Sequence, residues 1–229
     1  MHKLSSLTIF FPSLNDAKSL PNLIRKADRV ARQVTSRYEL IVINDGSTDD
    51  TATILKQAQK RFKNLRVITH GKNLGYGAAL ISGFGAARYD WVFYTDGDGQ
   101  YDPSELIKLV NLTNPTVDVV NGYKLKRADH WIRILIGSLY NRYAHVVTHL
   151  PISDVDCDFR LIRRAALANI TLTSQSGTIC IELISKLHQS KAIFAECAVH
   201  HYPRVYGKSE FFRISHLLET FKSITRGRF

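Results

Sequence analysis

Residues 94–103 read Tyr-Thr-Asp-Gly-Asp-Gly-Gln-Tyr-Asp-Pro and follow the apolar run Trp-Val-Phe at residues 91–93. This order predicts a buried strand that ends in an exposed, glycine-rich turn. Ligands of open α/β sheets bind at that edge, outside the carboxyl ends of the strands. Asp96 and Asp98 are too few for a calcium cage, but they suffice for Mg²⁺ or Mn²⁺, which often bind through one or two carboxylates plus substrate phosphates. Taken alone, the same string is also explained as a simple Asp-Gly turn.

Short apolar segments alternate with amphipathic segments through the first half of the chain. Strands are expected at residues 7–11, 39–44, 65–69, 90–95 and 117–121, and helices at residues 20–34, 51–62, 78–87 and 103–111. This alternation predicts an α/β fold whose sheet is mostly parallel and flanked by helices. No internal repeat or Pro/Gly linker interrupts it, so we expect one domain.

The second half is dominated by amphipathic helical patterns. Apolar residues recur at three- and four-residue spacing over residues 131–147, which predicts a long helix. Further helices are expected at residues 165–169 and 179–188, an apolar stretch at 159–162, a strand at 192–200 and a basic amphipathic helix at 210–229. That last helix favours contact with an anionic membrane surface, although a helix packed on the domain would show the same pattern.

Composition restricts the partners and the compartment. The formal net charge of +11 predicts an anionic partner, such as nucleotide phosphates, nucleic acid or an acidic membrane surface. Three cysteines without a C-x-x-C pair predict a reducing cytosol with neither disulfides nor zinc. No signal peptide or transmembrane segment is evident, so any membrane contact is expected to be peripheral.

Polar loops, three of which contain glycine, follow each of the first four expected strands. They are residues 12–16 (Pro-Ser-Leu-Asn-Asp), 44–49 (Asn-Asp-Gly-Ser-Thr-Asp), 71–79 (Gly-Lys-Asn-Leu-Gly-Tyr-Gly-Ala-Ala) and 96–103. The second could simply cap a helix, and the third opens a helix whose N–H groups could face an anion. Four such loops at one sheet edge favour a shared ligand site over four unrelated turns.

Together these loops resemble the family 2 glycosyltransferases with the GT-A fold. Within that family they are most similar to the dolichol-phosphate mannosyltransferase and undecaprenyl-phosphate sugar transferase branch. Residues 156–160 (Asp-Cys-Asp-Phe-Arg) and 201–209 (His-Tyr-Pro-Arg-Val-Tyr-Gly-Lys-Ser) are similar to later motifs of that branch. The resemblance implies a Rossmann-like domain over residues 1–229, with a nucleotide-sugar half (1–122), an acceptor half (123–209) and a basic tail (210–229).

The resemblance also implies roles for individual residues. The nucleotide sugar is expected to contact Pro12, Asn15, Asp16, Asp45, Asp49, Asn73, Gly75 and Asp96. Mg²⁺ or Mn²⁺ is expected at Asp96, Asp98 and Gln100. An acceptor phosphate is expected at Arg160, Arg204 and Lys208, and the catalytic set is Asp96, Asp98, Arg160 and Arg204.

Three departures from the family pattern involve four positions. Asp16 replaces a more usual Glu, and Asp158 replaces a Gly, which adds a negative charge near the expected acceptor phosphate. Lys208 and Glu210 stand where the mannosyltransferases have Glu followed by Lys.

The expected reaction is inverting transfer of a sugar from a UDP- or GDP-sugar to a polyprenyl phosphate at the cytoplasmic face of the cell membrane. The resemblance leaves room for a separate membrane-protein partner. One alternative is transfer to a sugar hydroxyl of a glycolipid or polysaccharide. A nucleic-acid-binding protein is disfavoured, because residues 45–50 and 96–102 place acidic loops where a phosphate backbone would meet repulsion.

Overall fold

The computed structural model describes residues 3–125 and 150–206. The expected helix at 131–147, the tail at 210–229 and Lys208 lie outside these ranges. No helix within the described ranges is long and apolar enough to cross a membrane.

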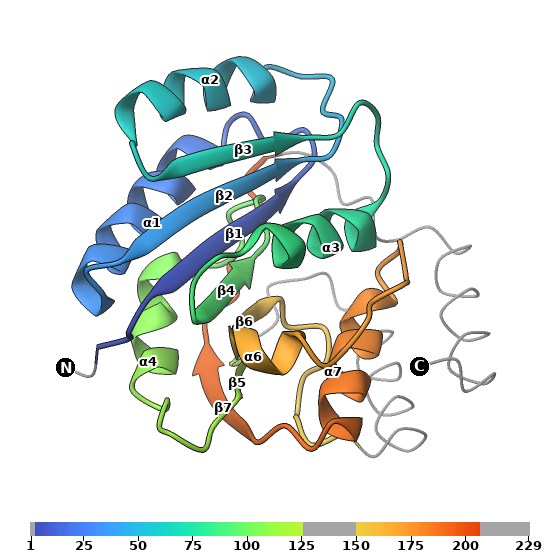
Figure 1. Ribbon diagram of the computed structural model, residues 1–229. Helices are drawn as coiled ribbons and strands as arrows, with labels where there is room; N and C mark the ends of the chain where they lie inside the picture. Colours follow the sequence, from blue (N-terminus) through green and yellow to red (C-terminus); the bar gives the residue numbers. More distant parts are fainter. Residues whose placement is uncertain (1–2, 126–149, 207–229) are drawn as a thin grey trace.

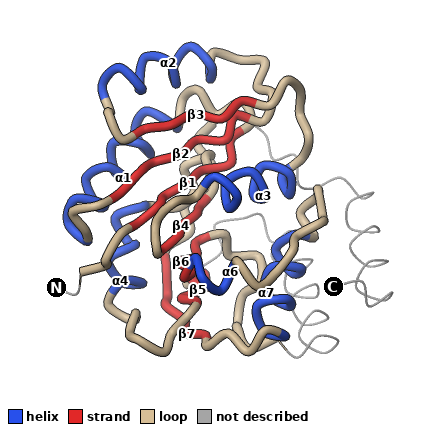
Figure 2. Tube along the Cα trace, viewed as in Figure 1, coloured by secondary structure: helices blue, strands red, loops and turns tan. Residues whose placement is uncertain are grey.

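Seven strands form one sheet in the order β3-β2-β1-β4-β6-β5-β7 (Figures 1 and 2). Their bounds are Leu7–Ser13 (β1), Tyr38–Asn44 (β2), Leu65–Thr69 (β3), Trp91–Thr95 (β4), Val119–Lys124 (β5), Phe159–Arg163 (β6) and Phe194–Val199 (β7). The predicted α/β class and mostly parallel sheet are confirmed. The exception is β6, which lies antiparallel between β4 and β5, with Phe93 opposite Leu161 and Val120 opposite Leu161.

Helices cover both faces of the sheet. Their bounds are Leu20–Val34 (α1), Thr51–Arg61 (α2), Tyr76–Ala86 (α3), Pro103–Glu105 (η1, a 3-10 turn), Leu106–Val110 (α4), Arg164–Leu167 (α6) and Ile179–Gln189 (α7). Apolar residues of α1, α2 and α4 pack in one core, and those of α3, α6 and α7 pack in the other (Figure 1). The helix expected at 103–111 is therefore divided, since Asp102 caps a 3-10 turn before α4 begins.

Alternation along the strands supplies both cores. In β1, Ile9 and Phe11 face one core while Phe10 faces the other. This is the two-residue period of a strand that is covered on both sides, which explains its continuous hydrophobicity. Phe10 stacks on Tyr94 at a centroid distance of 5.5 Å and meets Phe84 edge-on at 5.1 Å. These rings fix α3 against the centre of the sheet.

Replacing Phe10 with alanine should therefore destabilise the whole domain. We expect the free energy of unfolding to fall by about 3–5 kcal/mol, because a fully buried ring leaves a cavity. Urea denaturation followed by circular dichroism measures this loss. Leu112→Ala, at a position that is 39% exposed, is the matched control and should cost about 1 kcal/mol or less. Equal losses in the two variants would contradict the assignment of Phe10 to the core.

Candidate active site at the carboxyl edge of the sheet

The loops after β1 and β2 are joined by Asn15. Its backbone adopts a left-handed conformation with φ of 58°, and its side-chain oxygen accepts hydrogen bonds from the backbone N–H of Thr48 (2.8 Å) and Asp49 (3.3 Å). In return, the Asp49 carboxylate accepts from the N–H of Ala17 (3.2 Å). Burial alone would raise the pKa of Asp49, but hydrogen bonds from Thr51 and Ala17 lower it overall. Asn15 and Asp49 thus lie together and shape one rim of the edge.

Asp45 links the loop after β2 to the loop after β3. Its buried carboxylate accepts from His70 Nδ1 (2.6 Å) and from the backbone N–H of Leu74 and Gly75 (2.9 Å each). The other ring nitrogen of His70 lies 2.9 Å from Ser82 Oγ on α3. Most of the hydrogen-bonding capacity of Asp45 therefore serves the protein itself, a role that the sequence did not reveal.

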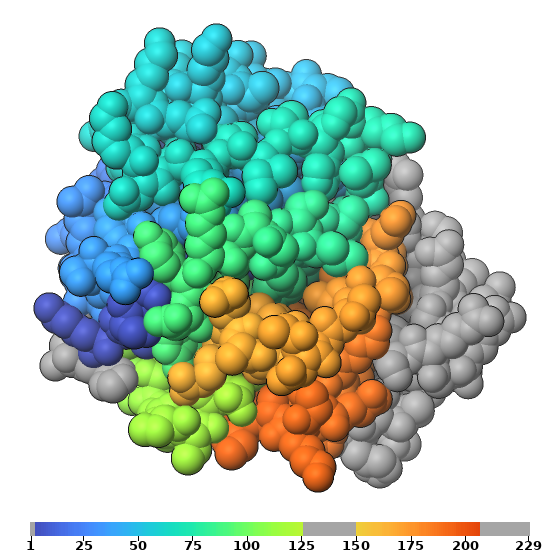
Figure 3. All heavy atoms as spheres, in the orientation of Figure 1, coloured from blue at the N-terminus to red at the C-terminus, as the bar shows by residue number. Residues whose placement is uncertain are grey.

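The glycine-rich loop packs against residues 173–176 instead of presenting an open helix end. Gly75 has φ of 98°, and a Cβ on it would lie 2.5 Å from the Gln175 carbonyl oxygen; a Cβ on Gly77 would lie 2.1 Å from that of Ser174. Gly77 N–H donates to the Gln175 oxygen (2.9 Å). Figure 3 shows this orange segment against the green surface of α3.

Two backbone donors at the start of α3, the N–H groups of Gly75 and Gly77, are consequently taken by protein acceptors. Gly75 N–H donates to both Asp45 and Asn73, each at 2.9 Å. The expectation that these N–H groups face an anion is therefore wrong for Gly75 and Gly77. Glycine is required here by close packing, which a sequence pattern does not distinguish from phosphate binding.

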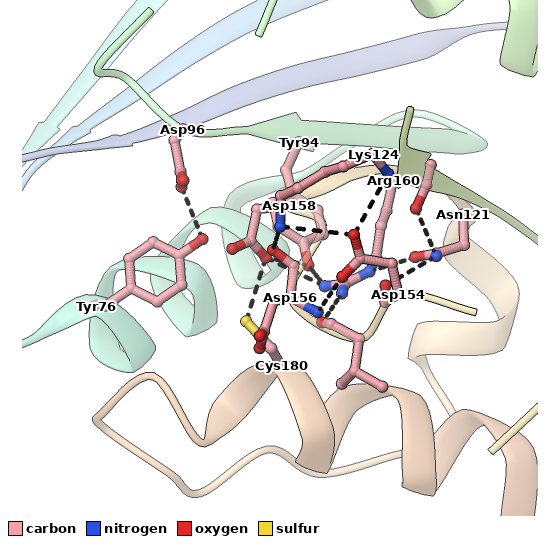
Figure 4. Close-up of polar contacts among 12 residues, drawn as sticks. Tyr76, Tyr94, Asp96, Asn121, Lys124, Asp154, Asp156, Asp158, Arg160 and Cys180 are labelled. Carbon is pink, nitrogen blue, oxygen red and sulfur yellow. Dashed lines mark hydrogen bonds and ion pairs between the residues drawn. The ribbon is translucent and has the colours of Figure 1, made fainter. Parts of the chain in front are cut away.

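Asp96 and Asp98 lie directly after β4, at the centre of the edge. Asp96 Oδ1 accepts from the Tyr76 hydroxyl at 2.8 Å (Figure 4). Asp98 is 7% exposed; its Oδ1 accepts from Gln100 N–H (2.9 Å), and its Oδ2 accepts from Arg204. Gly97 N–H donates to the Pro12 carbonyl at 3.1 Å, which joins this turn to the end of β1. Tyr76 was missed in the sequence because only the fold brings it to Asp96.

Negative charge is concentrated around this pair. Burial, then Asp158 and Asp98, raise the pKa of Asp96 well above its usual value. Burial, followed by the charge of Asp98, raises the pKa of Asp16 to about 6. Four carboxylates thus influence one another, and a cation among them would relieve their repulsion.

The donor chemistry of Asp96 and Asp98 fits Mg²⁺ or Mn²⁺, which take oxygen ligands and keep positions for phosphate or water. Gln100, the third expected ligand, lies on the same turn, but its side-chain amide nitrogen donates to the Tyr202 carbonyl (3.1 Å). No group of three or more His, Cys, Asp or Glu suited to a metal occurs among residues 3–125 and 150–206.

Arg160 lies in the interior of the protein. The side chain is fully buried on β6; Nε donates to Asn121 Oδ1 (2.6 Å), and the other nitrogens donate to Tyr94, Val155 and Asp158 (Figure 4). The expected contact between Arg160 and an acceptor phosphate does not fit this placement, since the guanidinium exposes no surface. Arg204, in contrast, lies at the site, where its guanidinium forms an ion pair with the Asp98 carboxylate.

The raised pKa of Asp16 predicts a pH-dependent stability. Between about pH 4 and pH 6, Asp16 is protonated in the folded protein but ionised in the unfolded chain. The stability of the folded protein therefore falls as pH rises through that window. Asp16→Asn removes this dependence on pH. We expect the difference in unfolding free energy, variant minus wild type, to grow from pH 4 to pH 6 and then level off. Urea titrations in EDTA measure it, with the exposed Asp50→Asn as control; a difference independent of pH would contradict the assignment.

Comparisons with known proteins agree with this architecture. Glucosyl-3-phosphoglycerate synthase from Mycobacterium tuberculosis, solved with Mn²⁺, UDP and phosphoglyceric acid, is similar over 97% of this chain and 75% of its own, at 17% identity and a TM-score of 0.69. Another structure of that synthase is 18% identical, is similar over 96% of this chain and 80% of its own, and has a TM-score of 0.67. A structure described only as a mycobacterial protein is 18% identical, is similar over 96% of this chain and 72% of its own, and has a TM-score of 0.72. At these identities the likeness shows the fold. The family model "Glycosyl transferase family 2" matches residues 8–171, and the chain therefore belongs to glycosyl transferase family 2.

Proposed function

We propose that this protein transfers a sugar from a nucleotide sugar to an acceptor, with Mg²⁺ or Mn²⁺ held by Asp96 and Asp98. The observation that carries this proposal is the position of the carboxylate pair: Asp98 is almost buried and Asp96 half-buried, at the sheet edge where ligands of such folds bind. Burial, followed by the charges of neighbouring carboxylates, raises the pKa of Asp16 and Asp96, which is not expected of a solvated surface turn.

The first two loops supply the donor side of the site. Pro12, Asn15, Asp45 and Asp49 lie at the same edge and are held by the hydrogen bonds between loops described above. Asp16 lies there too, and its backbone N–H donates to Thr51 Oγ1 (3.1 Å). The structures of glucosyl-3-phosphoglycerate synthase contain UDP and Mn²⁺, which supports a nucleoside diphosphate and a divalent ion here. When bound, the ion neutralises charge that develops on the departing diphosphate.

Asp96→Asn and Asp98→Asn should each reduce turnover by at least about 100-fold, because each removes a charged ligand of the ion. Neither should unfold the protein, since both residues lie on a turn after β4 and not in the apolar cores. Sugar transfer is measured with a panel of UDP- and GDP-sugars, and folding by circular dichroism. Full activity in excess EDTA, or in either folded variant, would overturn the metal assignment.

A hydroxyl acceptor is favoured by Asp158. A hydroxyl must lose a proton as it attacks, which requires a positioned base. Asp158 Oδ1 accepts from Arg160 (3.2 Å) and Cys180 (3.2 Å), and the charge of Asp158 raises the pKa of Asp96. Asp158 is thus a carboxylate held in a fixed position beside the expected metal pair. The synthase structures that contain phosphoglyceric acid are consistent with an acceptor of this class.

Polyprenyl phosphate is the second candidate acceptor, and Arg204 favours it. A phosphate monoester already carries an anionic oxygen at neutral pH and needs cations to position it. Arg204 lies on Asp98 and retains 27% exposure of its side chain. Peripheral attachment to the cytoplasmic face of an anionic membrane, through residues 210–229 or a membrane-protein partner, belongs to this candidate and rests on the sequence alone.

Asp158→Asn discriminates between the two acceptors. If a hydroxyl attacks, turnover should fall by about 10²–10⁴-fold, the usual contribution of a general base, while the affinity for the nucleotide sugar is kept. If a phosphate attacks, turnover should persist. The amide oxygen that this substitution introduces can still accept from Arg160, so the fold should survive. Asp156→Asn is the neighbouring control. Assays with a short polyprenyl phosphate and with phosphoglycerate test both classes, and a fully active Asp158→Asn enzyme would exclude Asp158 as the base.

A further inference from the structure

The segment after β7 is fastened to the turn that follows β4. Tyr202 N–H donates to the Gln100 carbonyl (2.8 Å), and the Gln100 side chain donates to the Tyr202 carbonyl (3.1 Å). Nearby, His200 Nδ1 lies 2.8 Å from Glu105. Two hydrogen bonds to backbone atoms thus set the distance between residues 200–206 and Asp98. This attachment of the backbone places Arg204 beside Asp98.

Arg204 bonds to one oxygen of Asp98, a carboxylate that is expected to hold the metal ion. Its Nη2 donates to Asp98 Oδ2, while Asp98 Oδ1 already accepts from the N–H of Gln100. Both oxygens of Asp98 therefore have partners within the protein. An ion that binds Asp98 must share the carboxylate with these two donors or displace one of them.

The charge of Arg204 reaches beyond Asp98. Asp96 lies two residues before Asp98 on the same turn, and Asp16 lies against that turn, since a Cβ on Gly97 would lie 3.0 Å from Asp16 Oδ2. One guanidinium thus partly balances three carboxylates. A second cation placed among them meets repulsion from Arg204, whereas a diphosphate offers the guanidinium a new, two-pronged partner.

We propose that Arg204 is the internal counter-cation of this carboxylate cluster and makes metal binding depend on the nucleotide. Arg204 disfavours a divalent ion that binds alone and favours one that binds together with a nucleoside diphosphate, whose phosphates take over the guanidinium from Asp98. Arg204 is thereby a positioning residue for the donor. The inference rests on the proposed function, because it requires a nucleotide and a metal at this edge.

The two halves of this statement predict effects of opposite sign. In Arg204→Met, a substitution that removes the charge and keeps most of the length, Mn²⁺ alone should bind about tenfold more tightly, and UDP with saturating Mn²⁺ about tenfold more weakly. Arg204→Lys should restore the weak binding of Mn²⁺ alone but only part of the nucleotide affinity, since an ammonium group lacks the fork. Electron paramagnetic resonance of free Mn²⁺ measures the first affinity, and calorimetry with UDP, and in parallel with GDP, measures the second.

Arg61→Met, at the exposed end of α2, is the matched control and should change neither affinity. An Arg204→Met protein whose Mn²⁺ affinity is unchanged or lower would overturn the inference, as would unchanged nucleotide affinity. Wild-type protein that binds neither UDP nor GDP with Mn²⁺ would overturn the proposed function itself. If the wild type binds a nucleotide, but the Mn²⁺ affinity and the nucleotide affinity of Arg204→Met shift in the same direction, the inference about Arg204 is wrong and the proposed function stands.

Discussion

Electrostatic repulsion among carboxylates that are wholly or partly buried is the constraint around which the carboxyl edge of this sheet is built. Asp16, Asp96, Asp98 and Asp158 come from three segments of the chain, and burial, followed by the charges of these neighbours, raises the pKa of Asp16 and Asp96. Burial of unbalanced charge is costly, so the surrounding structure must supply positive charge or protons. Many of the polar contacts at this edge are consequences of that requirement.

Two arginines meet the requirement in different ways. Arg160 approaches from inside the sheet, where it binds Asp158 and ties β6 to Asn121 on β5 and Tyr94 on β4. Removing one partner of such a buried pair would leave an uncompensated charge, so Arg160 is bound to its place. Arg204 comes from the segment after β7, which two hydrogen bonds between Tyr202 and Gln100 attach to the turn after β4. Part of the Arg204 side chain remains exposed. Only the second arginine is placed to exchange one anionic partner for another.

The sequence predicted what local pattern controls and missed what the fold brings together. Continuous apolar runs placed β1, β2 and β4, because a strand covered on both faces needs no polar alternation. The loops that carry Asn15, Asp49, Asp96 and Asp98 were found because each follows such a run. The burial of Arg160 was not predictable, since it arises from the antiparallel insertion of β6 between β4 and β5. The Tyr76–Asp96 and Arg204–Asp98 contacts likewise depend on segments that are distant in sequence.

The packing of the glycine-rich loop limits how a diphosphate is held. Glu182 on α7 accepts from the N–H of Thr173 (2.9 Å) and Ser174 (2.8 Å), and this fixes residues 173–176 on the start of α3. The helix N-terminus, a common phosphate site in α/β proteins, therefore has its donors at Gly75 and Gly77 already satisfied. On the proposed function, the ion at Asp96 and Asp98 and the guanidinium of Arg204 neutralise the leaving diphosphate, since the N–H groups of Gly75 and Gly77 already have protein acceptors. The packing of residues 173–176 thus favours binding of the diphosphate by the metal and the arginine.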